Sequence, residues 1–466
     1  MLFNSVQYFL FLALVLLLFY NSAGTLRKFI LLVASYGFYA WWNWKFVPLL
    51  LVLTTIDYWA AIWMTRARPE RKRAFLLISV LANLSFLCVF KYYNFLADNV
   101  AGLIGLPPSA FNLSIVLPLG ISFHTLQSIS YVVNVYRGEQ KPITNPLDYA
   151  LFICFFPQLV AGPIVRARVF FRDLYHWRPP SREEQASAIL LIALGLAKKM
   201  AFADNLARVS DSYFNNLAQH PGLLTAWTGS IAFILQVYFD FSGYTDIAIG
   251  SAKLLGFHFP VNFNRPFLAA SMTEFWRRWH ISLSTWLRDY VYIPLATRRS
   301  GEGFLHVNLM ITMIVAGLWH GASWNFVVWG AYNGVLLSLE RAWRVWRRRR
   351  PAVPATVDLH ALQVCCTFLL FSAGAPFFRL AKFSDAVAVI GQMFHGSPGV
   401  ILFNSWQIGL IAVSFFLARW EESKGWFERL VTGPVWAYAG AMTLILICLE
   451  LFGVTESVVP FVYFQF

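Results

Sequence analysis

The feature that most constrains this chain is the alternation of long apolar runs with clusters of Lys and Arg. Of its 466 residues, 58% are hydrophobic and 13% are charged, which is about half the charged share of an average soluble domain. A helix satisfies its own backbone hydrogen bonds, so long apolar runs adopt helices in lipid. The sequence therefore predicts an all-α polytopic membrane protein and excludes a soluble enzyme.

The net charge of +14 agrees with this prediction. Lys and Arg collect on the cytoplasmic side of membrane proteins, so the positive charge indicates orientation in a lipid bilayer, and we expect no nucleic-acid partner. The five cysteines lie in apolar runs without the spacing of a zinc or thioredoxin site. We expect no metal site and no permanently bound cofactor.

The basic clusters also order the spans. Clusters at 27–28, 66–73 and 137–141 fall on one side if the apolar runs between them cross the membrane. Residues 6–20 lack the basic start and the cleavage site of a signal peptide, so we expect a retained first span and an extracytoplasmic N-terminus. About eleven full or partial spans result. Outside the segments treated below, they are 6–20, 29–44, 46–64, 74–96, 114–136, 186–203, 223–255, 361–378, 408–420 and 435–452.

Two segments differ from simple spans. Residues 147–165 have basic residues on both sides and are interrupted by Pro157, Gly162 and Pro163, which predicts a re-entrant segment covered by protein. Residues 258–301 mix Arg with Trp and Tyr at helical spacing, which predicts interfacial helix on the cytoplasmic face. We expect one membrane domain over 1–466, with N-terminal spans at 1–140, a catalytic core at 141–345 and C-terminal spans at 346–466.

His320 is notable because it lies between two apolar segments, 304–318 and 324–339. The outer ends of both segments carry Arg clusters, so the segments form a hairpin or a broken pair, and Gly321 permits a sharp turn between them. A titratable group at membrane depth is costly and marks a functional site by default. A core histidine that bonds a carbonyl group is the alternative.

A second group of polar residues lies in the sequence FWRRWHISLS at 275–284. On a continuous helix, Trp276, His280 and Ser284 share one face, and Glu274 can pair with Arg278 one turn later. The alternative is an amphipathic helix whose basic side chains extend to the membrane interface.

Two carboxylates, Asp240 and Asp246, lie within the apolar run at 223–255. Their spacing does not place them on one helical face unless Gly243 breaks the helix. Either carboxylate can orient a histidine or bind a cation, and polar contact between helices is the alternative. The Arg residues in 158–168 suit a phosphate group, or they mark the cytoplasmic side.

Together these residues predict a membrane-embedded histidine with Arg-rich, aromatic surfaces on the cytoplasmic side. An anionic cytoplasmic ligand can dock on such a surface and present a reactive end inward. A neutral imidazole near pH 7 can activate a hydroxyl group as a general base. This arrangement fits a transferase, and it also fits a transporter with a proton-coupled histidine.

The order and spacing of several motifs carry a family resemblance. They are ASYGFYAWW (34–42), PLGISF (118–123), FPQLVAGPI (156–164), DFSGYTDIA (240–248), NFNRPF (262–267), FWRRWH (275–280), GLWHG (317–321) and YFQF (463–466). In this order the chain resembles the membrane-bound O-acyltransferases. It is most similar to the bacterial branch that acetylates exported polysaccharides such as alginate, peptidoglycan and cellulose.

The resemblance implies a ring of spans, with re-entrant and interfacial helices, around a central channel. It implies transfer of acetyl from cytoplasmic acetyl-CoA through the inner membrane of a bacterium to an exported polysaccharide. The expected partners are a periplasmic SGNH hydrolase-like acetyltransferase and the exopolysaccharide machinery. The resemblance makes His320 the essential histidine and His280 the second conserved one.

For coenzyme A and the substrate we expect a wider set of residues. The phosphate groups are expected on Arg265, Arg277 and Arg278. The remaining candidates for contact with substrate are Trp276, Trp319, Ser284, Asp240 and Asp246.

Three positions depart from the family pattern, namely His124, Asn134 and Leu380. These departures affect the assignment of the subfamily, and therefore of the acceptor, more than the assignment of the chemistry. The alternatives in function are a D-alanyl or other acyl transferase that uses a carrier-protein thioester, a membrane transporter of acylated precursors, and a scaffold that recruits a synthase.

Overall fold

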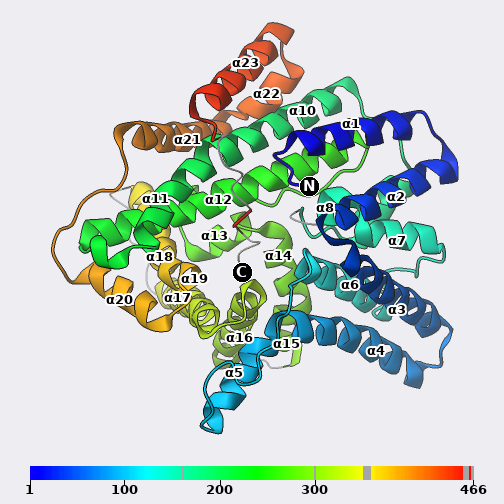
Figure 1. Ribbon diagram of the computed structural model, residues 1–466, viewed down its shortest axis with the longest axis horizontal. Coiled ribbons are helices and arrows are strands. Elements are labelled where there is room, and N and C mark those ends of the chain that lie inside the picture. Colours follow the sequence, from blue (N-terminus) through cyan, green and yellow to red (C-terminus); the bar gives the residue numbers. More distant parts are fainter. Residues whose placement is uncertain (160–161, 299–300, 350–357, 455–460, 463–466) are drawn as a thin grey trace. The chain divides into compact units, whose positions relative to one another are not determined.

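The computed structural model describes residues 1–159, 162–298, 301–349, 358–454 and 461–462, and its regular elements within them are helices (Figure 1). The chain divides into two compact units, one of residues 1–192 and 244–260 and the other of 193–243 and 261–466. Seven helices of the described chain are long and apolar enough to cross a membrane. The prediction of an all-helical polytopic membrane protein is confirmed. The ring of about eleven spans and the three-part division of the domain stay predictions.

A buried carboxylate helps to hold the first unit together. Asp57 of α3 accepts hydrogen bonds from Ser79 and Asn83 of α4, and all three side chains are buried. Such polar contacts bind helices together where lipid offers no polar partner. The elements are α1 (Val6–Tyr20), α2 (Gly24–Asn43), η1 (Trp44–Phe46), α3 (Val47–Arg66), α4 (Pro69–Leu87), η2 (Cys88–Tyr92), α5 (Tyr93–Leu103), α6 (Ile121–Tyr136), α7 (Pro146–Cys154), α8 (Phe156–Leu159), α9 (Ala167–Tyr175) and the start of α10 (Arg182–Ala197).

The second unit contains a long helical hairpin. Its helices α16 (Glu302–His320) and α17 (Trp324–Arg348) pack along each other, and α17 also packs on α19 (Figure 1). The other elements are η3 (Lys198–Ala203), α11 (Asp204–Phe214), η4 (Leu217–Gln219), α12 (Leu223–Leu254) as far as Gly243, η5 (Pro266–Leu268), α13 (Met272–Arg278), α14 (Ile281–Leu287), η6 (Arg288–Tyr292), α15 (Ile293–Arg298), α18 (His360–Ala373), α19 (Ala375–Arg379), α20 (Phe383–Phe394), α21 (Ser405–Lys424), α22 (Trp426–Thr432) and α23 (Val435–Phe452).

Neither of the two segments that differ from simple spans is a single uninterrupted helix. Helix α7 has nine residues, which is about 14 Å of helix and too short to cross a membrane. The chain then leaves helical geometry at Phe155, and residues 160–161 of this motif lie outside the described residues. Between 258 and 301 the chain forms the seven-residue α13 and then a continuous helical run, in which the π-helical turn η6 joins α14 to α15. Re-entrance and interfacial placement themselves stay predictions.

Helix α12 shows what Gly243 does. The helix continues for 32 residues, so Gly243 does not break it, and Asp240 and Asp246 do not share a face. A Cβ atom at Gly243 would lie 2.7 Å from the carbonyl oxygen of Gly195 in α10. The missing side chain therefore allows close helix packing, which small residues permit in membrane proteins.

The turn between α16 and α17 also corrects a prediction. Gly321 has φ −161°, an extended conformation that any residue adopts, so the turn does not need glycine for its backbone. A Cβ atom at Gly321 would collide with the ring of Phe326. Glycine is present because the aromatic ring occupies the space of a side chain.

Close backbone contact in this hairpin gives a stability prediction. A Cβ atom at Gly330 would clash with the backbone of Met313 and Ile314, whereas nothing lies within 4 Å of a Cβ atom at Gly303. We expect Gly330→Ala to destabilise the protein by about 1–3 kcal/mol, measured as a lower unfolding temperature in detergent. Gly303→Ala on α16 is the control and is expected to cause no loss. Equal unfolding temperatures for the two variants would contradict the packing of α16 on α17.

Candidate active site

His320 is the last residue of α16, and its side chain is buried, with 4% exposed. Helix α16 has 19 residues, so His320 lies about 27 Å along the helix axis from Glu302. The hairpin that the sequence predicted at this position is present. It carries the imidazole away from the Arg residues that flank the outer ends of α16 and α17.

An aromatic cage surrounds the imidazole of His320. The ring centroid of Trp319 lies 4.9 Å from that of His320, and those of Phe378 and Trp329 lie at 5.1 and 5.3 Å. Each of these three rings meets the imidazole nearly edge to face, which is a geometry that aromatic pairs prefer. Three different helices, α16, α17 and α19, therefore fix the position of the imidazole.

The second histidine lies at a break between two helices, which corrects a prediction. Helix α13 ends at Arg278 and α14 begins at Ile281. His280 lies between them in the left-handed region, with φ 41°. Trp276, His280 and Ser284 therefore do not form one helical face. The hydroxyl group of Ser284 instead donates to the carbonyl oxygen of Trp279 at 3.0 Å.

A neighbouring loop explains the break at His280. The backbone N–H of Ile281 donates to the carbonyl oxygen of Asn262 at 2.8 Å, and the N–H of Asn264 donates to that of Arg278 at 2.9 Å. These contacts replace helical hydrogen bonds at this point. A left-handed non-glycine residue costs free energy and persists where its surroundings hold it, often at functional sites.

The side chain of Asn262 orients the buried imidazole of His280. Its Oδ1 accepts from the backbone N–H and the hydroxyl group of Ser282 at 3.1 and 2.9 Å, and it lies 3.3 Å from Nδ1 of His280. An amide oxygen only accepts, so Nδ1 carries the proton and the lone pair of neutral imidazole lies on Nε2. Burial lowers the pKa of His280 to about 3. The ring is therefore neutral near pH 7.

The indole of Trp319 joins the two histidines. Its ring centroid lies 5.7 Å from that of His280 and 4.9 Å from that of His320. Residues far apart in the sequence thus form one buried centre in the second unit. Trp276 reaches the same centre through Trp329, with 6.0 Å between the ring centroids.

Two buried indole N–H groups near His320 lack a protein acceptor. Within the described residues, neither Nε1 of Trp276 nor Nε1 of Trp329 has a hydrogen-bond partner. An unsatisfied buried donor costs about 1–3 kcal/mol, so such groups in a native structure need an explanation. Donors that a substrate oxygen satisfies are one such explanation.

Asp240 belongs to a buried ion cluster. Lys199 Nζ lies 2.8 Å from Asp204 Oδ1 and 2.9 Å from Asp240 Oδ1, and all three side chains are at most 3% exposed. Asp240 Oδ2 accepts from the backbone N–H of Val462 at 2.6 Å. The carboxylate of Asp240 thus neutralises a lysine and holds the 461–462 segment.

This ion cluster lies beside His280. Phe241, next to Asp240, has its ring centroid 4.7 Å from that of His280 and 5.5 Å from that of Phe461. The cluster therefore supports the packing around His280 through the ring of Phe241. Asp246 lies farther along α12, in the first unit.

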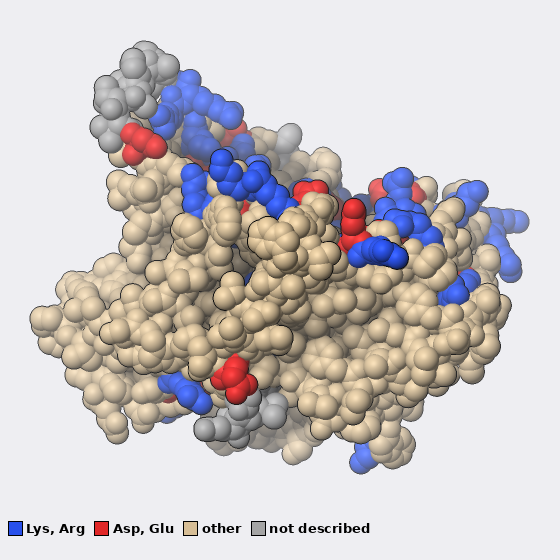
Figure 2. All heavy atoms as spheres, turned by 90° about the horizontal axis from the view of Figure 1, so that it is seen from above, with Lys and Arg blue, Asp and Glu red and all other residues tan. Residues whose placement is uncertain are grey.

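The three predicted phosphate ligands differ in their charge balance. Arg278 pairs with Glu274 at 2.6 Å and with Glu422 at 2.8 Å, and Arg265 lies 3.9 Å from Glu421. Arg277 is exposed and has no ion pair within the described chain. Figure 2 shows Lys and Arg side chains gathered along one edge of the face in view. Of the three, Arg277 has the charge that is free for an anionic ligand.

Several contributing residues were not assigned from the sequence. Asn262 was part of a motif but had no role, and its clamp on His280 depends on a loop that folds back. Phe378 and Trp329 looked like ordinary apolar residues. Lys199 had a signal, because a lysine within an apolar run needs a partner.

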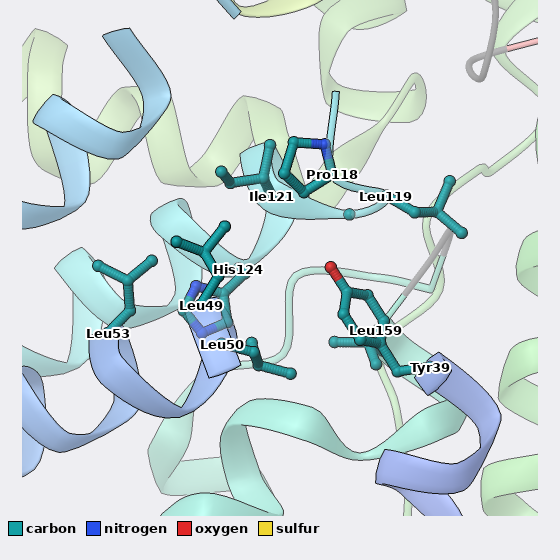
Figure 3. A pocket seen from close by; sticks show the side chains of 10 residues that line it. Tyr39, Leu49, Leu50, Leu53, Pro118, Leu119, Ile121, His124 and Leu159 are labelled. Carbon is teal, nitrogen blue, oxygen red and sulfur yellow. The ribbon is translucent and has the colours of Figure 1, made fainter. Parts of the chain in front are cut away.

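A third buried histidine, His124, lines a small cavity in the first unit (Figure 3). Within the described chain neither of its ring nitrogens has a hydrogen-bond partner. The cavity volume of about 10 Å³ holds about one water molecule. The site is therefore too small for a sugar or a pantetheine arm. Its other lining residues are Tyr39, Leu49, Leu50, Leu53, Pro118, Leu119, Gly120, Ile121 and Leu159.

Comparison with known proteins gives one consistent result. Residues 71–378 match the model of the membrane-bound O-acyltransferase family. The chain is 41% identical over 399 residues to a probable alginate O-acetylase from Azotobacter vinelandii, an alignment that covers 84% of this chain and 77% of the relative. A probable alginate O-acetylase from Pseudomonas aeruginosa is 40% identical over 413 residues, with 87% and 75% covered. A peptidoglycan O-acetyltransferase from Helicobacter pylori is 34% identical over 469 residues, with 94% and 86% covered.

The buried state of His280 gives a pH prediction. Its pKa falls from the ordinary 6.5 to about 3 on folding, so between these values the unfolded chain binds more protons than the folded one. Stability therefore falls as pH falls through this window, by up to about 1.4 kcal/mol per pH unit. We expect His280→Asn to show a shallower fall of unfolding temperature than wild type between about pH 6.5 and 4.

The control for this measurement is His395→Asn, which changes an exposed histidine of the same unit. This variant is expected to keep the wild-type slope. A wild-type slope in His280→Asn would contradict a neutral, buried His280.

Proposed function

Because the chain belongs to the membrane-bound O-acyltransferase family, we propose that it takes acetyl from cytoplasmic acetyl-CoA and passes it across a bacterial inner membrane for O-acetylation of an exported polysaccharide. The names of the relatives, for alginate and peptidoglycan, support a glycan as final acceptor. The observation that carries the proposal is the buried pair of His320 and His280 on either side of Trp319.

His320 acts as the general base. It takes the proton from an acceptor hydroxyl group, whose oxygen attacks the carbonyl carbon of the acetyl thioester. The tetrahedral intermediate collapses as the C–S bond breaks, and the imidazolium returns the proton to the departing thiolate. The products are an acetyl ester and coenzyme A, so the proton and the electron pairs balance.

His280 positions the thioester. Its Nδ1 is committed to Asn262, so Nε2 is the nitrogen that faces a reactant. A neutral ring with a fixed tautomer orients a dipole without adding a charge to the buried centre. The cage of Trp319, Trp329 and Phe378 around His320 excludes water, which protects the thioester from hydrolysis.

The indole N–H groups of Trp276 and Trp329 receive the developing oxyanion. Both donors are buried and without a described acceptor, and the Trp329 ring lies 5.3 Å from that of His320. Donors that are fixed in advance at the point where negative charge develops lower the barrier strongly. The oxyanion in turn supplies an acceptor for these two indole N–H groups.

Coenzyme A docks on the Arg-rich side. Arg277 takes a phosphate group first, because Arg278 and Arg265 lie beside Glu274, Glu422 and Glu421. Arg binds phosphate with two parallel hydrogen bonds. The pantetheine arm then extends along Trp276 toward His320.

The acceptor hydroxyl group belongs to the glycan or to a periplasmic SGNH hydrolase-like partner that completes the transfer. Two other functions make different predictions. A D-alanyl transferase takes its thioester from a carrier protein, so consumption of acetyl-CoA by the purified protein argues against it. A transporter of acylated precursors keeps its solute flux when His320 is replaced.

Replacement of His320 tests its role as the general base. We expect His320→Ala to lower acetyl transfer from radiolabelled acetyl-CoA by about 10²–10⁴-fold while the unfolding temperature stays near that of wild type. His306→Ala, on the same helix, is the matched control and is expected to keep its activity. Wild-type transfer by a folded His320→Ala protein would eliminate the assigned role.

Replacement of Trp329 tests the role of its indole N–H as a donor to the oxyanion. Trp329→Phe removes the N–H donor and keeps an aromatic ring against His320, so we expect kcat to fall by about 10²-fold with little change in KM for acetyl-CoA. Trp343→Phe on the same helix, whose indole is exposed, is the control. A change in KM alone would assign Trp329 to binding and not to the transition state.

A further inference from the structure

A second cavity in the second unit has the chemistry of a saccharide site. Its volume is about 380 Å³, and its lining residues are Asn205, Arg208, Trp406, Leu451, Phe452, Gly453 and Val454. This space is ample for one sugar ring with its substituents. The cavity is separate from the cage around His320, and the proposed reaction does not use it.

The cavity lies at the ends of α21 and α23 that are away from Lys424 and Arg429. Trp406 is near the start of α21, and Phe452 ends α23. At their other ends, these helices lie next to Lys424 and to Arg429 of α22. Helix α23 has 18 residues, or about 27 Å of rise. If the Arg-rich side is cytoplasmic, the cavity faces the compartment of an exported glycan.

Arg208 supplies the positive charge of the cavity. It is exposed, and Asp204, the carboxylate that interacts with it electrostatically, forms its ion pair with Lys199. A guanidinium group binds a carboxylate with two parallel hydrogen bonds. This favours a ligand that carries a carboxylate group.

The end of α23 supplies the opposite kind of group. The last carbonyl groups of a helix lack an intrahelical partner. The oxygen of Leu449 is used by Gly453 N–H at 2.8 Å, and that of Phe452 by Asn205 Nδ2 at 2.7 Å. Leu451 lies between them at the cavity. The carbonyl group of Leu451 is an acceptor, so it favours a hydroxyl donor on the same ligand.

Trp406 adds an aromatic face. Its ring is stacked on Phe452 with 5.7 Å between centroids, and 39% of the side chain is exposed. An exposed aromatic face offers an apolar surface of the kind on which the C–H face of a sugar ring packs. A guanidinium group, a carbonyl acceptor and an indole face together match a sugar acid better than a neutral sugar or a bare phosphate.

We propose that this cavity binds a uronic acid residue of the acceptor polysaccharide. The inference rests on the proposed function, because it gives that function its substrate class. A chain of contacts joins the cavity to the reaction centre. Asn205 follows Asp204, Lys199 joins Asp204 to Asp240, and Phe241 packs on His280.

The test is binding of oligosaccharides to the purified full-length protein in nanodiscs, followed by calorimetry. The probes are a tetrasaccharide of mannuronic acid, cellotetraose as its neutral counterpart, and short-chain phosphatidylglycerol as the lipid competitor. We expect the wild-type protein to bind the acidic tetrasaccharide. Its affinity for cellotetraose, and the affinity of Arg208→Gln for the acidic tetrasaccharide, are each expected to be lower by about tenfold or more. Trp406→Leu is expected to weaken binding of both saccharides.

Arg429→Gln at the other end of the helices is the matched control and is expected to bind as wild type does. Arg208→Lys keeps the charge without the two-pronged geometry, so it gives an intermediate affinity and serves if Arg208→Gln does not fold. Equal binding of the acidic and neutral saccharides, full affinity in Arg208→Gln, or displacement by phosphatidylglycerol at equal concentration would each overturn the proposal.

Binding and catalysis are measured separately. If the wild-type protein cleaves acetyl-CoA but does not bind the acidic tetrasaccharide, the uronate site is overturned and the proposed function stays in place. If binding of the tetrasaccharide depends on Arg208 but His320→Ala does not affect acetyl transfer, the site is supported and the proposed mechanism is overturned.

Discussion

The close contact between α16 and α17 is the interaction on which the reaction centre depends. Gly317 and Gly330 bring the two backbones together, and lipid-embedded helices associate through such small residues because lipid supplies no hydrophobic driving force between them. This contact fixes the short turn after His320 and places Trp329 beside its ring. A looser hairpin would let the imidazole rotate away from Trp319 and from His280.

Buried polar groups impose the second constraint. Lys199, Asp204 and Asp240 satisfy one another away from water, and removal of one member of such a cluster typically costs about 3–5 kcal/mol. Asn262 does the same for His280 and also sets its tautomer. The polar groups therefore have two effects: they hold the second unit together and they determine which ring nitrogen of His280 carries the proton.

Residue patterns predicted the helical membrane class, the bounds of α23 and the hairpin at His320, because these depend on local apolar composition and on charge at helix ends. They did not predict the break at His280, since its cause is a loop around Asn262 that is distant in sequence. They also did not predict the role of Gly321, because the ring that fills the space beside it comes from α17. Of the two partners of Arg278, Glu274 is predictable because it lies one helical turn away, whereas Glu422 is distant in sequence and is brought close only by folding.

The central claim is that the two-histidine centre passes acetyl from one face of the membrane to the other. The most direct measurement uses proteoliposomes in which the protein has one orientation, with radiolabelled acetyl-CoA on the Arg-rich face and an oligosaccharide acceptor, with any required partner, on the other. Label on the enclosed acceptor, lost in His320→Ala, is the expected result. Label that reaches an acceptor only on the donor's own face would contradict the claim.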